Sequence, residues 1–339
     1  MVLPDANAVW VMGHRNPDTD CTIAAIAYAA LKQMHEDGDT RYIPVVLGLV
    51  NAETRVVLQR FGVPVPAELH EVREITDNDT GAGTVQGIGA RVILVDHSQK
   101  SQSVAGLDTA EVVEVVDHHN IGDITTGAPI FFLADPVGAT ATLIAEMYLQ
   151  PAWCRHLPHP ERVMLDDATA GILLSAVISD TLLLRSPTTT ARDRQVLATL
   201  ATRTGVDVDA LANEMFAARS DISARSADDL VGNDYKPYTF GDTSVGVAQV
   251  DVLSLDAVRG RYGELRAALT AAKERQGMDI YLLMMTDIVG ESTDLLYDAV
   301  SKPLVSRIFE GKDGDGYLHL PGVVSRKKQL IPPLSAHLS

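Results

Sequence analysis

The sequence predicts an α/β protein of two domains: an N-terminal parallel sheet with helices on both faces, and a smaller C-terminal α/β domain. Three observations predict this. The first half alternates short Val- and Ile-rich runs with segments whose apolar residues recur at helical spacing. A small, polar stretch without a period follows, and then a second series of strands and helices begins. The length of 339 residues suits two domains of about 150 residues each.

The strands expected in the first half are short apolar runs, typical of strands buried on both faces. They cover residues 8–12, 42–47, 91–96 and 111–117. Helices are expected where apolar residues recur every three or four positions, over residues 19–38, 52–61, 139–149, 166–178, 190–204 and 208–218. Because strands and helices alternate, right-handed crossovers should make this sheet parallel.

The polar stretch at residues 219–226 predicts a domain boundary. We expect one domain at residues 1–219, a linker at 220–226 and a second domain at 227–339. Beyond the linker the pattern predicts strands at 238–240, 246–252 and 280–285 and helices at 254–276 (a long helix) and 302–309. A segment at 320–330 that Gly and Pro interrupt follows.

Composition narrows the function. Asp and Glu total 45 against 28 Lys and Arg, a formal charge of −17, which disfavours binding to nucleic acid or anionic lipid. Two cysteines, Cys21 and Cys154, cannot build a disulfide framework. The sequence has no apolar run near the ~20 residues of a membrane span, and residues 1–7 lack the basic start of a signal peptide. We therefore expect a cytoplasmic protein without nucleic-acid or membrane partners.

Asp and His residues gather where expected strands end. They are His14, Asp18 and Asp20 after the first strand, Asp96 and His97 after a second, Asp117, His118 and His119 at a third, and Asp180 at the end of an apolar helix. In such sheets ligands bind beyond the carboxyl ends of the strands. So many carboxylates would repel one another without a cation. Mixed imidazole and carboxylate ligands suit Mn²⁺, Fe²⁺, Co²⁺ or Zn²⁺, and their number predicts two ions.

Each of these groups also has a structural interpretation. Asp18 and Asp20 stand where a helix begins and could cap it. Asp180 could cap the loop after its helix. A basic run at residues 325–328, with Lys236 apart from it, is either a solvated surface patch or a clamp for an anion. Cations opposite a metal centre would suit a small phosphate substrate.

Six motifs carry a family resemblance. In chain order they are Gly13-His14-Arg15-Asn16-Pro17-Asp18-Thr19-Asp20, Asp96-His97, Asp117-His118-His119, Ser175 to Thr181 with Asp180, Ser186-Pro187-Thr188 and Ser325-Arg326-Lys327-Lys328. Over positions 8–334 the chain closely resembles the family II (manganese-dependent) inorganic pyrophosphatases of the DHH phosphoesterase superfamily. The first and third motifs mark the superfamily, and the Ser-Arg-Lys-Lys ending narrows it to pyrophosphatases.

The resemblance implies hydrolysis of inorganic pyrophosphate to two phosphates by a metal-bridged hydroxide, in a cleft between a DHH-type domain and a substrate-binding domain. His14 and Asp18 would hold one ion, Asp20, His118 and Asp180 the other, and Asp96 would bridge the two. Substrate-binding groups would be His119, Lys236, Arg326 and Lys327; Asp96, His119, Arg326 and Lys327 would act in catalysis, and Asp117 would orient a ligand imidazole. Two Mn²⁺ ions, with Co²⁺ as a substitute, Mg²⁺ arriving with substrate, and a homodimer are expected.

Two departures and two rival functions follow from the comparison with this family. Cys21 stands where a Ser is common, and Ser98 where an Asn is common; neither change removes a proposed ligand. An exopolyphosphatase or another DHH phosphoesterase is the enzymatic alternative, although the chain lacks the Gly-Gly-Gly-His-like motif of nuclease-type relatives. A non-catalytic phosphate- or metal-binding regulator would have lost ligands, and all six are present.

Overall fold

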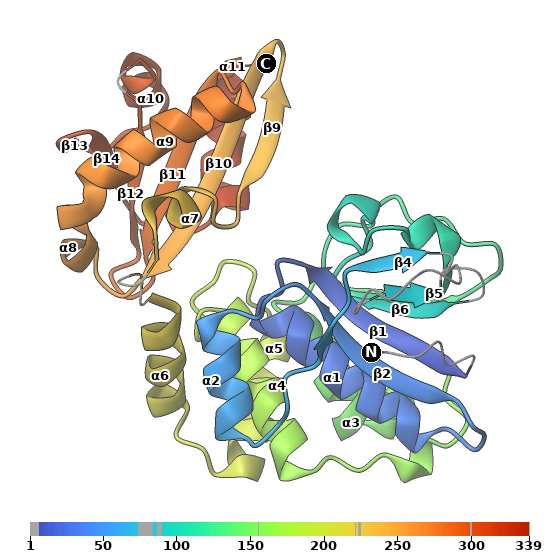
Figure 1. The fold of residues 1–339 in the computed structure, drawn as a ribbon. Helices are drawn as coiled ribbons and strands as arrows, with labels where there is room; N and C mark the ends of the chain where they lie inside the picture. Colours follow the sequence, from blue (N-terminus) through green and yellow to red (C-terminus); the bar gives the residue numbers. More distant parts are fainter. Residues whose placement is uncertain are drawn as a thin grey trace. The chain divides into compact units, whose positions relative to one another are not determined.

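The computed structural model describes residues 7–73, 84–86, 90–154, 156–220, 222, 225–298 and 300–338. The chain divides into two compact units, Met1–Met215 and Phe216–Ser339, each of which has its own sheet (Figure 1). The expected linker at 220–226 falls near this division, and its residues 221, 223 and 224 lie outside the described residues, as do residues 1–6. The expected domain limits themselves stay a prediction.

The N-terminal unit contains a parallel sheet in the order β3-β2-β1-β6-β7-β8. Its strands are β3 (Ala67–Glu68), β2 (Arg41–Leu47), β1 (Ala8–Arg15), β6 (Arg91–Val95), β7 (Glu111–Asp117) and β8 (Phe131–Ala134). The expected parallel sheet is confirmed, and β3 and β8 extend it beyond the expected strands. Because β1, β6 and β7 are neighbours, their carboxyl ends lie together at one edge.

Helices cover one face of this sheet. The helix α1 (Thr19–Met34) packs against β1 and β2, α3 (Thr140–Leu149) and α4 (Asp167–Asp180) pack against α1, and α5 (Ala191–Thr204) packs against α4. Small side chains such as Ala24 and Ala27 on α1 are fully buried and allow this close approach. The unit also contains α2 (Ala52–Arg60), and α6 (Val208–Ser220) runs across the division between the two units.

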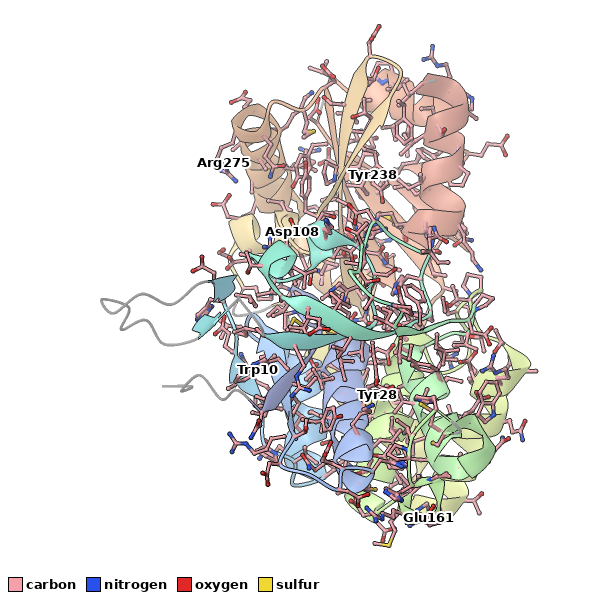
Figure 2. The ribbon with its side chains drawn as sticks, turned by 90° about the vertical axis from the view of Figure 1, so that its right-hand side faces the viewer. Trp10, Tyr28, Asp108, Glu161, Tyr238 and Arg275 are labelled. Carbon is pink, nitrogen blue, oxygen red and sulfur yellow. The ribbon has the colours of Figure 1, made fainter. Side chains whose placement is uncertain are left out.

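The other face of the sheet is covered by different elements. Trp10 and Met12 of β1 pack there in one apolar cluster with Val72, Val104 and Leu107, and Figure 2 shows Trp10 and Tyr28 in the N-terminal unit. The residues on this face come from two stretches of chain. The stretch before β6 carries β4 (Glu71–Arg73) and β5 (Thr84–Gln86), and the stretch after β6 carries two single 3₁₀ turns, Lys100–Gln102 and Leu107–Thr109. Successive strand residues alternate between faces, so burial on both sides explains the continuous apolar runs of the sequence.

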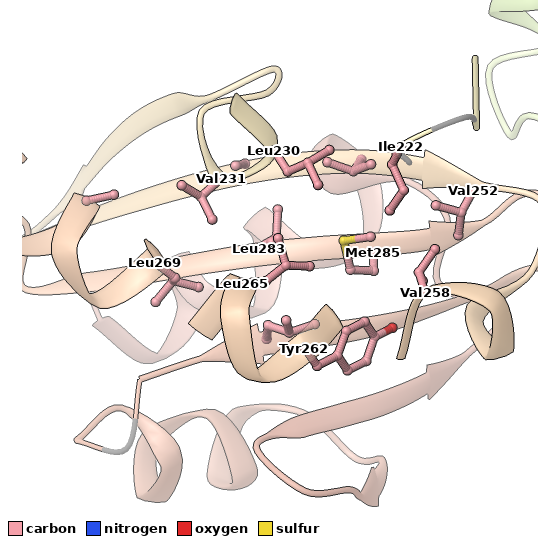
Figure 3. Packing of buried hydrophobic residues seen from close by; sticks show 14 of the residues in the cluster. Ile222, Leu230, Val231, Val252, Val258, Tyr262, Leu265, Leu269, Leu283 and Met285 are labelled. Atoms are coloured by element: carbon pink, nitrogen blue, oxygen red, sulfur yellow. The ribbon is translucent and has the colours of Figure 1, made fainter. Parts of the chain in front are cut away.

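The C-terminal unit contains a mixed sheet in the order β13-β14-β12-β11-β10-β9. Its strands are β13 (Lys312–Asp313), β14 (Tyr317–Pro321), β12 (Ser292–Tyr297), β11 (Ile280–Asp287), β10 (Thr243–Val252) and β9 (Lys236–Phe240). The pair β10–β11 is parallel, and the other pairs are antiparallel. On one face Leu283 and Met285 of β11 pack against Leu265 and Leu269 of α9 (Tyr262–Gln276), as Figure 3 shows.

The prediction of one continuous helix at 254–276 is wrong, because the structure divides this range into shorter elements. The chain forms α8 (Leu255–Val258), a 3₁₀ turn at Arg259–Arg261 and only then α9. Gly260 and Gly263 lie at this break, and each glycine costs a helix about 1 kcal/mol relative to alanine. The other helices are α7 (Ala227–Val231), α10 (Lys302–Ile308), a short π-helix (Arg326–Leu330) and α11 (Ile331–Leu338). Among the described residues no helix is long and apolar enough to cross a bilayer.

Candidate metal centre

The edge where β1, β6 and β7 end brings the predicted Asp and His residues together. His14 is the penultimate residue of β1, Asp96 directly follows β6, and His118 directly follows β7. Asp180, the last residue of α4, reaches the same place. Three groups of potential metal ligands result, each with its ligand atoms within 4.8 Å of one another: His14, Asp18, Cys21 and Asp96; Asp96, His118 and His119; and Asp20, His118 and Asp180.

The first group surrounds the imidazole of His14. Its Nε2 lies 3.3 Å from Asp18 Oδ2 and 3.5 Å from Asp96 Oδ2. The other ring nitrogen, Nδ1, is 2.9 Å from the carbonyl oxygen of Arg15. Because Nδ1 donates its proton to that carbonyl, Nε2 keeps a lone pair directed toward the carboxylates. This is the arrangement that a metal-binding histidine needs.

The second and third groups share His118. Its Nε2 lies 3.6 Å from Asp180 Oδ2 and 3.3 Å from Asp96 Oδ1, while its Nδ1 is 2.9 Å from the carbonyl oxygen of Val137. Asp96 thus presents Oδ2 to His14 and Oδ1 to His118. A carboxylate in that position can bind one ion with each oxygen, the role that the family resemblance implies for Asp96.

Asp18 and Asp20 combine the structural and the ligand interpretations. Asp18 is the N-cap of α1: its Oδ1 accepts a hydrogen bond from Cys21 N at 2.9 Å, which leaves Oδ2 for His14. Asp20 caps a different helix, because its two oxygens accept from Thr140 N (2.6 Å) and Ala141 N (3.0 Å) in the first turn of α3. The N-cap residue of α3 supplies no side-chain bond.

Burial and charge in the group suit a bound cation. Asp96 is 1% exposed, and its Oδ2, like His118 Nε2, is buried without a hydrogen-bond partner among the described residues. Burial by itself raises the pKa of Asp96, but the nearby imidazoles of His118 and His14 hold it well below the usual range. Burial and the Asp96 charge raise the pKa of Asp20 well above its usual value. The residues present therefore fit divalent ions.

The ligand histidines show the same electrostatic pattern. Burial lowers the pKa of His14, but Cys21 and Asp18 outweigh it, so that the pKa lies well above the usual value. For His118, burial is outweighed by the nearby carboxylate of Asp96, and the pKa is again well above the usual value. Burial raises the pKa of the Cys21 thiol to about 12. The carboxylates around both imidazoles thus favour positive charge at this place.

His119, Asp117 and His97 take separate places. His119 is half-exposed, with Nδ1 3.1 Å from Asp117 Oδ1 and 3.6 Å from Asp96 Oδ1; Asp117 also accepts from the His119 backbone N–H at 2.9 Å. Asp117 therefore orients His119. His97 belongs to none of the three groups: its Nδ1 lies 3.0 Å from the Val95 carbonyl oxygen, and burial lowers its pKa to about 4.

Thr140 is a site residue that the sequence did not reveal. It is fully buried at the start of α3, and its Oγ1 donates to Asp96 Oδ1 at 2.8 Å. Nothing in the sequence links positions 140 and 96, so only the folded chain reveals the contact. Asp96 itself has φ 62°, a left-handed conformation that is costly for a residue with a side chain. The turn after β6 is thus held in one arrangement around this carboxylate.

The predicted phosphate-binding cations lie on the C-terminal unit. Arg326 is 7% exposed; its Nη2 donates to Asp234 Oδ2 at 2.8 Å and its Nη1 to the carbonyl oxygens of Asp234 and, at 3.4 Å, Val247. Val247 pairs with Lys236 between β10 and β9, so Arg326 and Lys236 share one end of that strand pair. Lys236 and Lys327 are both exposed.

Comparisons with known proteins identify the class to which this fold and site belong. Residues 8–177 match the model of the DHH family, N-terminal domain, and residues 213–337 match the DHHA2 domain. The chain is therefore a two-domain DHH protein. Both matches agree with the two units of the structure, and the first contains every residue of the three candidate ligand groups except Asp180.

Full-length relatives define the family more narrowly. A Methanothrix thermoacetophila protein named manganese-dependent inorganic pyrophosphatase is 36% identical over 98% of both chains. A Bacillus licheniformis protein named "Probable manganese-dependent inorganic pyrophosphatase" is 37% identical over 97% of this chain and 98% of its own. A crystal structure described as "Methanococcus jannaschii putative family II inorganic pyrophosphatase" matches with a TM-score of 0.78 at 33% identity, covering 97% of this chain and 99% of that one. This chain belongs to the manganese-dependent, family II inorganic pyrophosphatases.

Proposed function

We propose that this chain hydrolyses inorganic pyrophosphate to two phosphates at the metal centre on its N-terminal unit. The observation that carries the proposal is the position of Asp96, whose two oxygens face two different histidines, each with its own carboxylates. The names of the full-length relatives support pyrophosphate as the substrate. The proposed ligands are His14, Asp18, Asp20, Asp96, His118 and Asp180.

The proposed metal ions are two Mn²⁺, for which Co²⁺ can substitute, with Mg²⁺ bound to the substrate phosphates. When bound, such ions supply the charge that brings the pKa of an attacking water toward neutrality and offset the charge of the phosphoryl oxygens. The protein fixes the ligands that this chemistry needs. Thr140 holds Asp96, Val137 and Arg15 hold the ligand imidazoles, and the amides of α3 hold Asp20.

His119 is the proposed substrate contact on the N-terminal unit. Asp117 Oδ1 lies 3.1 Å from its Nδ1, which leaves Nε2 of a half-exposed ring as the nitrogen available to the substrate. Lys236, Arg326 and Lys327 are the proposed phosphate-binding cations of the C-terminal unit. The guanidinium of Arg326 has five N–H donors and three acceptors around it, so it retains donors for a phosphate. These cations neutralise charge that grows on the leaving phosphate.

Three further expectations belong to this proposal. The metal centre and the C-terminal cations are proposed to act on the same pyrophosphate. The protein works in the cytoplasm, which supplies Mn²⁺, Mg²⁺ and pyrophosphate. It also forms a homodimer, for which analytical ultracentrifugation at micromolar concentration should give twice the chain mass of 36.4 kDa.

Phosphate release from pyrophosphate tests the proposed function. The purified chain is stripped with EDTA, reloaded with Mn²⁺ and assayed beside tripolyphosphate and a short oligonucleotide. Rapid release from pyrophosphate that requires Mn²⁺ supports the proposal. Faster release from tripolyphosphate would instead favour an exopolyphosphatase, the alternative function, and nucleotide release would favour a nuclease-type DHH phosphoesterase.

A matched pair of variants assigns the activity to the site. Asp96→Asn removes charge from the carboxylate between the two histidines and should abolish Mn²⁺-dependent release. Asp108→Asn removes the same charge from an exposed side chain that pairs with Lys100 and is labelled in Figure 2. The second variant should hydrolyse pyrophosphate like the unaltered chain. Equal activity of the two variants would overturn the assignment.

A further inference from the structure

The thiol of Cys21 is part of the first ligand group although sequence patterns gave it no role. Its Sγ lies within 4.8 Å of the ligand atoms of His14, Asp18 and Asp96. The side chain is 1% exposed, and its Sγ lies 3.8 Å from the Asp18 carbonyl oxygen, a long contact even for sulfur. A thiol held by so weak a contact can turn its sulfur toward the group.

The backbone around Cys21 makes room for the sulfur at this place. Cys21 stands in the first turn of α1, and Gly13 of β1 lies directly against it. A Cβ atom at position 13 would come within 2.6 Å of Cys21 Cβ and 2.9 Å of Sγ, distances that no relaxed structure accepts. Glycine at position 13 therefore lets the cysteine side chain lie between the strand and the ligand atoms.

A second observation shows that this group is built for a ligand. Asp96 Oδ2, the oxygen that faces His14 at 3.5 Å, is buried and has no hydrogen-bond partner in the described part of the chain. A buried carboxylate oxygen without a partner is costly, and a cation among these atoms removes that cost. The sulfur, the His14 nitrogen and two carboxylates lie around the same point.

We propose that Cys21 is a sulfur ligand of the first metal site, which makes the two sites chemically different. The first site then offers sulfur, nitrogen and oxygen, whereas Asp20, His118 and Asp180 offer nitrogen and oxygen alone. The proposal rests on the proposed metal centre. As the ion binds, the thiol proton passes to solvent and the Sγ electron pair forms the bond to the ion.

Sulfur selects softer ions than oxygen does. Thiolate ligands favour Zn²⁺ and soft ions such as Cd²⁺, while carboxylates suit Mn²⁺ and Mg²⁺. The first site should therefore bind Zn²⁺, Co²⁺ or Cd²⁺ in preference to Mn²⁺ more strongly than the second site does. When the two kinds of ion compete, the chain should hold a mixed pair, with the softer ion beside Cys21.

Cobalt absorption tests the sulfur bond without any assay of activity. The EDTA-stripped full chain is titrated with Co²⁺, and the near-ultraviolet sulfur-to-cobalt charge-transfer band is recorded with the number of ions bound. Cys21→Ser keeps the size and polarity of the side chain and removes the sulfur. Cys154→Ser is the matched control, since Cys154 is also fully buried, and its Sγ donates to the Met147 carbonyl oxygen at 3.1 Å. A parallel titration with Cd²⁺ measures affinity.

The expected result is a charge-transfer band in the unaltered chain and in Cys154→Ser, and its loss in Cys21→Ser with two ions still bound. The dissociation constant for one Cd²⁺ should rise at least about tenfold in Cys21→Ser. Removal of a group that only supports a ligand already weakens metal binding by about tenfold, so removal of the ligand itself should cost no less. If the unaltered chain binds two Co²⁺ ions without the charge-transfer band, the proposed sulfur ligand is overturned and the metal centre remains supported. Failure of the unaltered chain to bind Co²⁺ would overturn the metal centre itself.

Discussion

Asp20 performs two tasks that one substitution can separate. Its oxygens accept from Thr140 N at 2.6 Å and Ala141 N at 3.0 Å, in a position with no solvent exposure. In Asp20→Asn one oxygen becomes an NH₂ group, which cannot accept. One buried amide of α3 therefore loses its acceptor, and the free energy of unfolding should fall by about 1–3 kcal/mol in EDTA.

The proposed ligand role of Asp20 predicts a second, metal-dependent loss of stability. An ion that binds only the folded chain stabilises it by about 2.7 kcal/mol when its concentration is a hundred times the dissociation constant. At that Mn²⁺ concentration the unaltered chain should gain this amount for each occupied site. Asp20→Asn should lose the gain of the second site. Asp180→Asn removes a proposed ligand while Asp20 keeps both of its bonds to the α3 amides, so it should lose the metal gain with a smaller effect in EDTA.

Urea unfolding, followed by tryptophan fluorescence, measures both losses of unfolding free energy, the one in EDTA and the one with Mn²⁺, in the N-terminal unit. The two tryptophans, Trp10 and Trp153, both lie in the N-terminal unit, so the signal reports that unit. An EDTA midpoint of Asp20→Asn equal to that of the unaltered chain would refute the helix-capping argument. An undiminished gain from Mn²⁺ in the same variant would refute Asp20 as a ligand.

Three other predictions test the electrostatics, the support of the centre and the phosphate contacts. The pKa values of His14 and His118 are raised on folding, so the stability they contribute is complete below about pH 6.5 and is lost as the pH rises through the raised values. The urea midpoint in EDTA should therefore fall between pH 6.5 and pH 9. Mn²⁺, which replaces the protons, should remove that fall. A midpoint in EDTA that is constant over this range would contradict the shifts. Thr140→Val removes the donor to Asp96 and should weaken Mn²⁺ binding about 10–100-fold, measured by calorimetric titration; unchanged affinity would show that the hydroxyl does not support the centre. Lys327→Ala should raise KM for pyrophosphate about tenfold, the loss of one charge-assisted hydrogen bond of about 1.5 kcal/mol, with the bound Mn²⁺ unchanged by elemental analysis; lost metal would contradict its assignment to the substrate.

The placement of the ligands could be predicted because it follows from topology. Asp96 and His118 each come directly after a Val- and Ile-rich strand, and the carboxyl ends of neighbouring parallel strands share one edge. The sequence therefore places them together without any knowledge of distances. His14 follows from the same argument on β1. The structure brings all three to that edge, with Asp96 between the two histidines.

The finer contacts could not be predicted, because they join positions far apart in the chain. Asp20 stands at the start of α1, which suggested a cap of that helix, yet it caps α3, 120 residues later. His97 shares the Asp-His pattern with His118, but its Nδ1 turns to the Val95 carbonyl oxygen and it joins none of the groups. Side-chain direction in these turns depends on backbone angles such as the positive φ of Asp96, which the residue type does not reveal.

The C-terminal unit shows a second limit of the sequence pattern. The strand β12 contains Asp294, which is fully buried and would argue against a strand in the core. Its carboxylate is satisfied by Arg259 Nε at 2.9 Å, Tyr262 Oη at 3.0 Å and His319 Nδ1 at 2.7 Å. Those partners come from three different elements, and the compensation is visible only after folding.

Anomalous diffraction at the manganese absorption edge, from crystals of the Mn²⁺-loaded chain, tests the central claim most directly. The account predicts two peaks, one beside His14 and Asp18 and the other beside Asp20, His118 and Asp180, with Asp96 in contact with both. A single peak, or peaks away from these side chains, would contradict the two-metal centre on which the proposed hydrolysis of pyrophosphate depends.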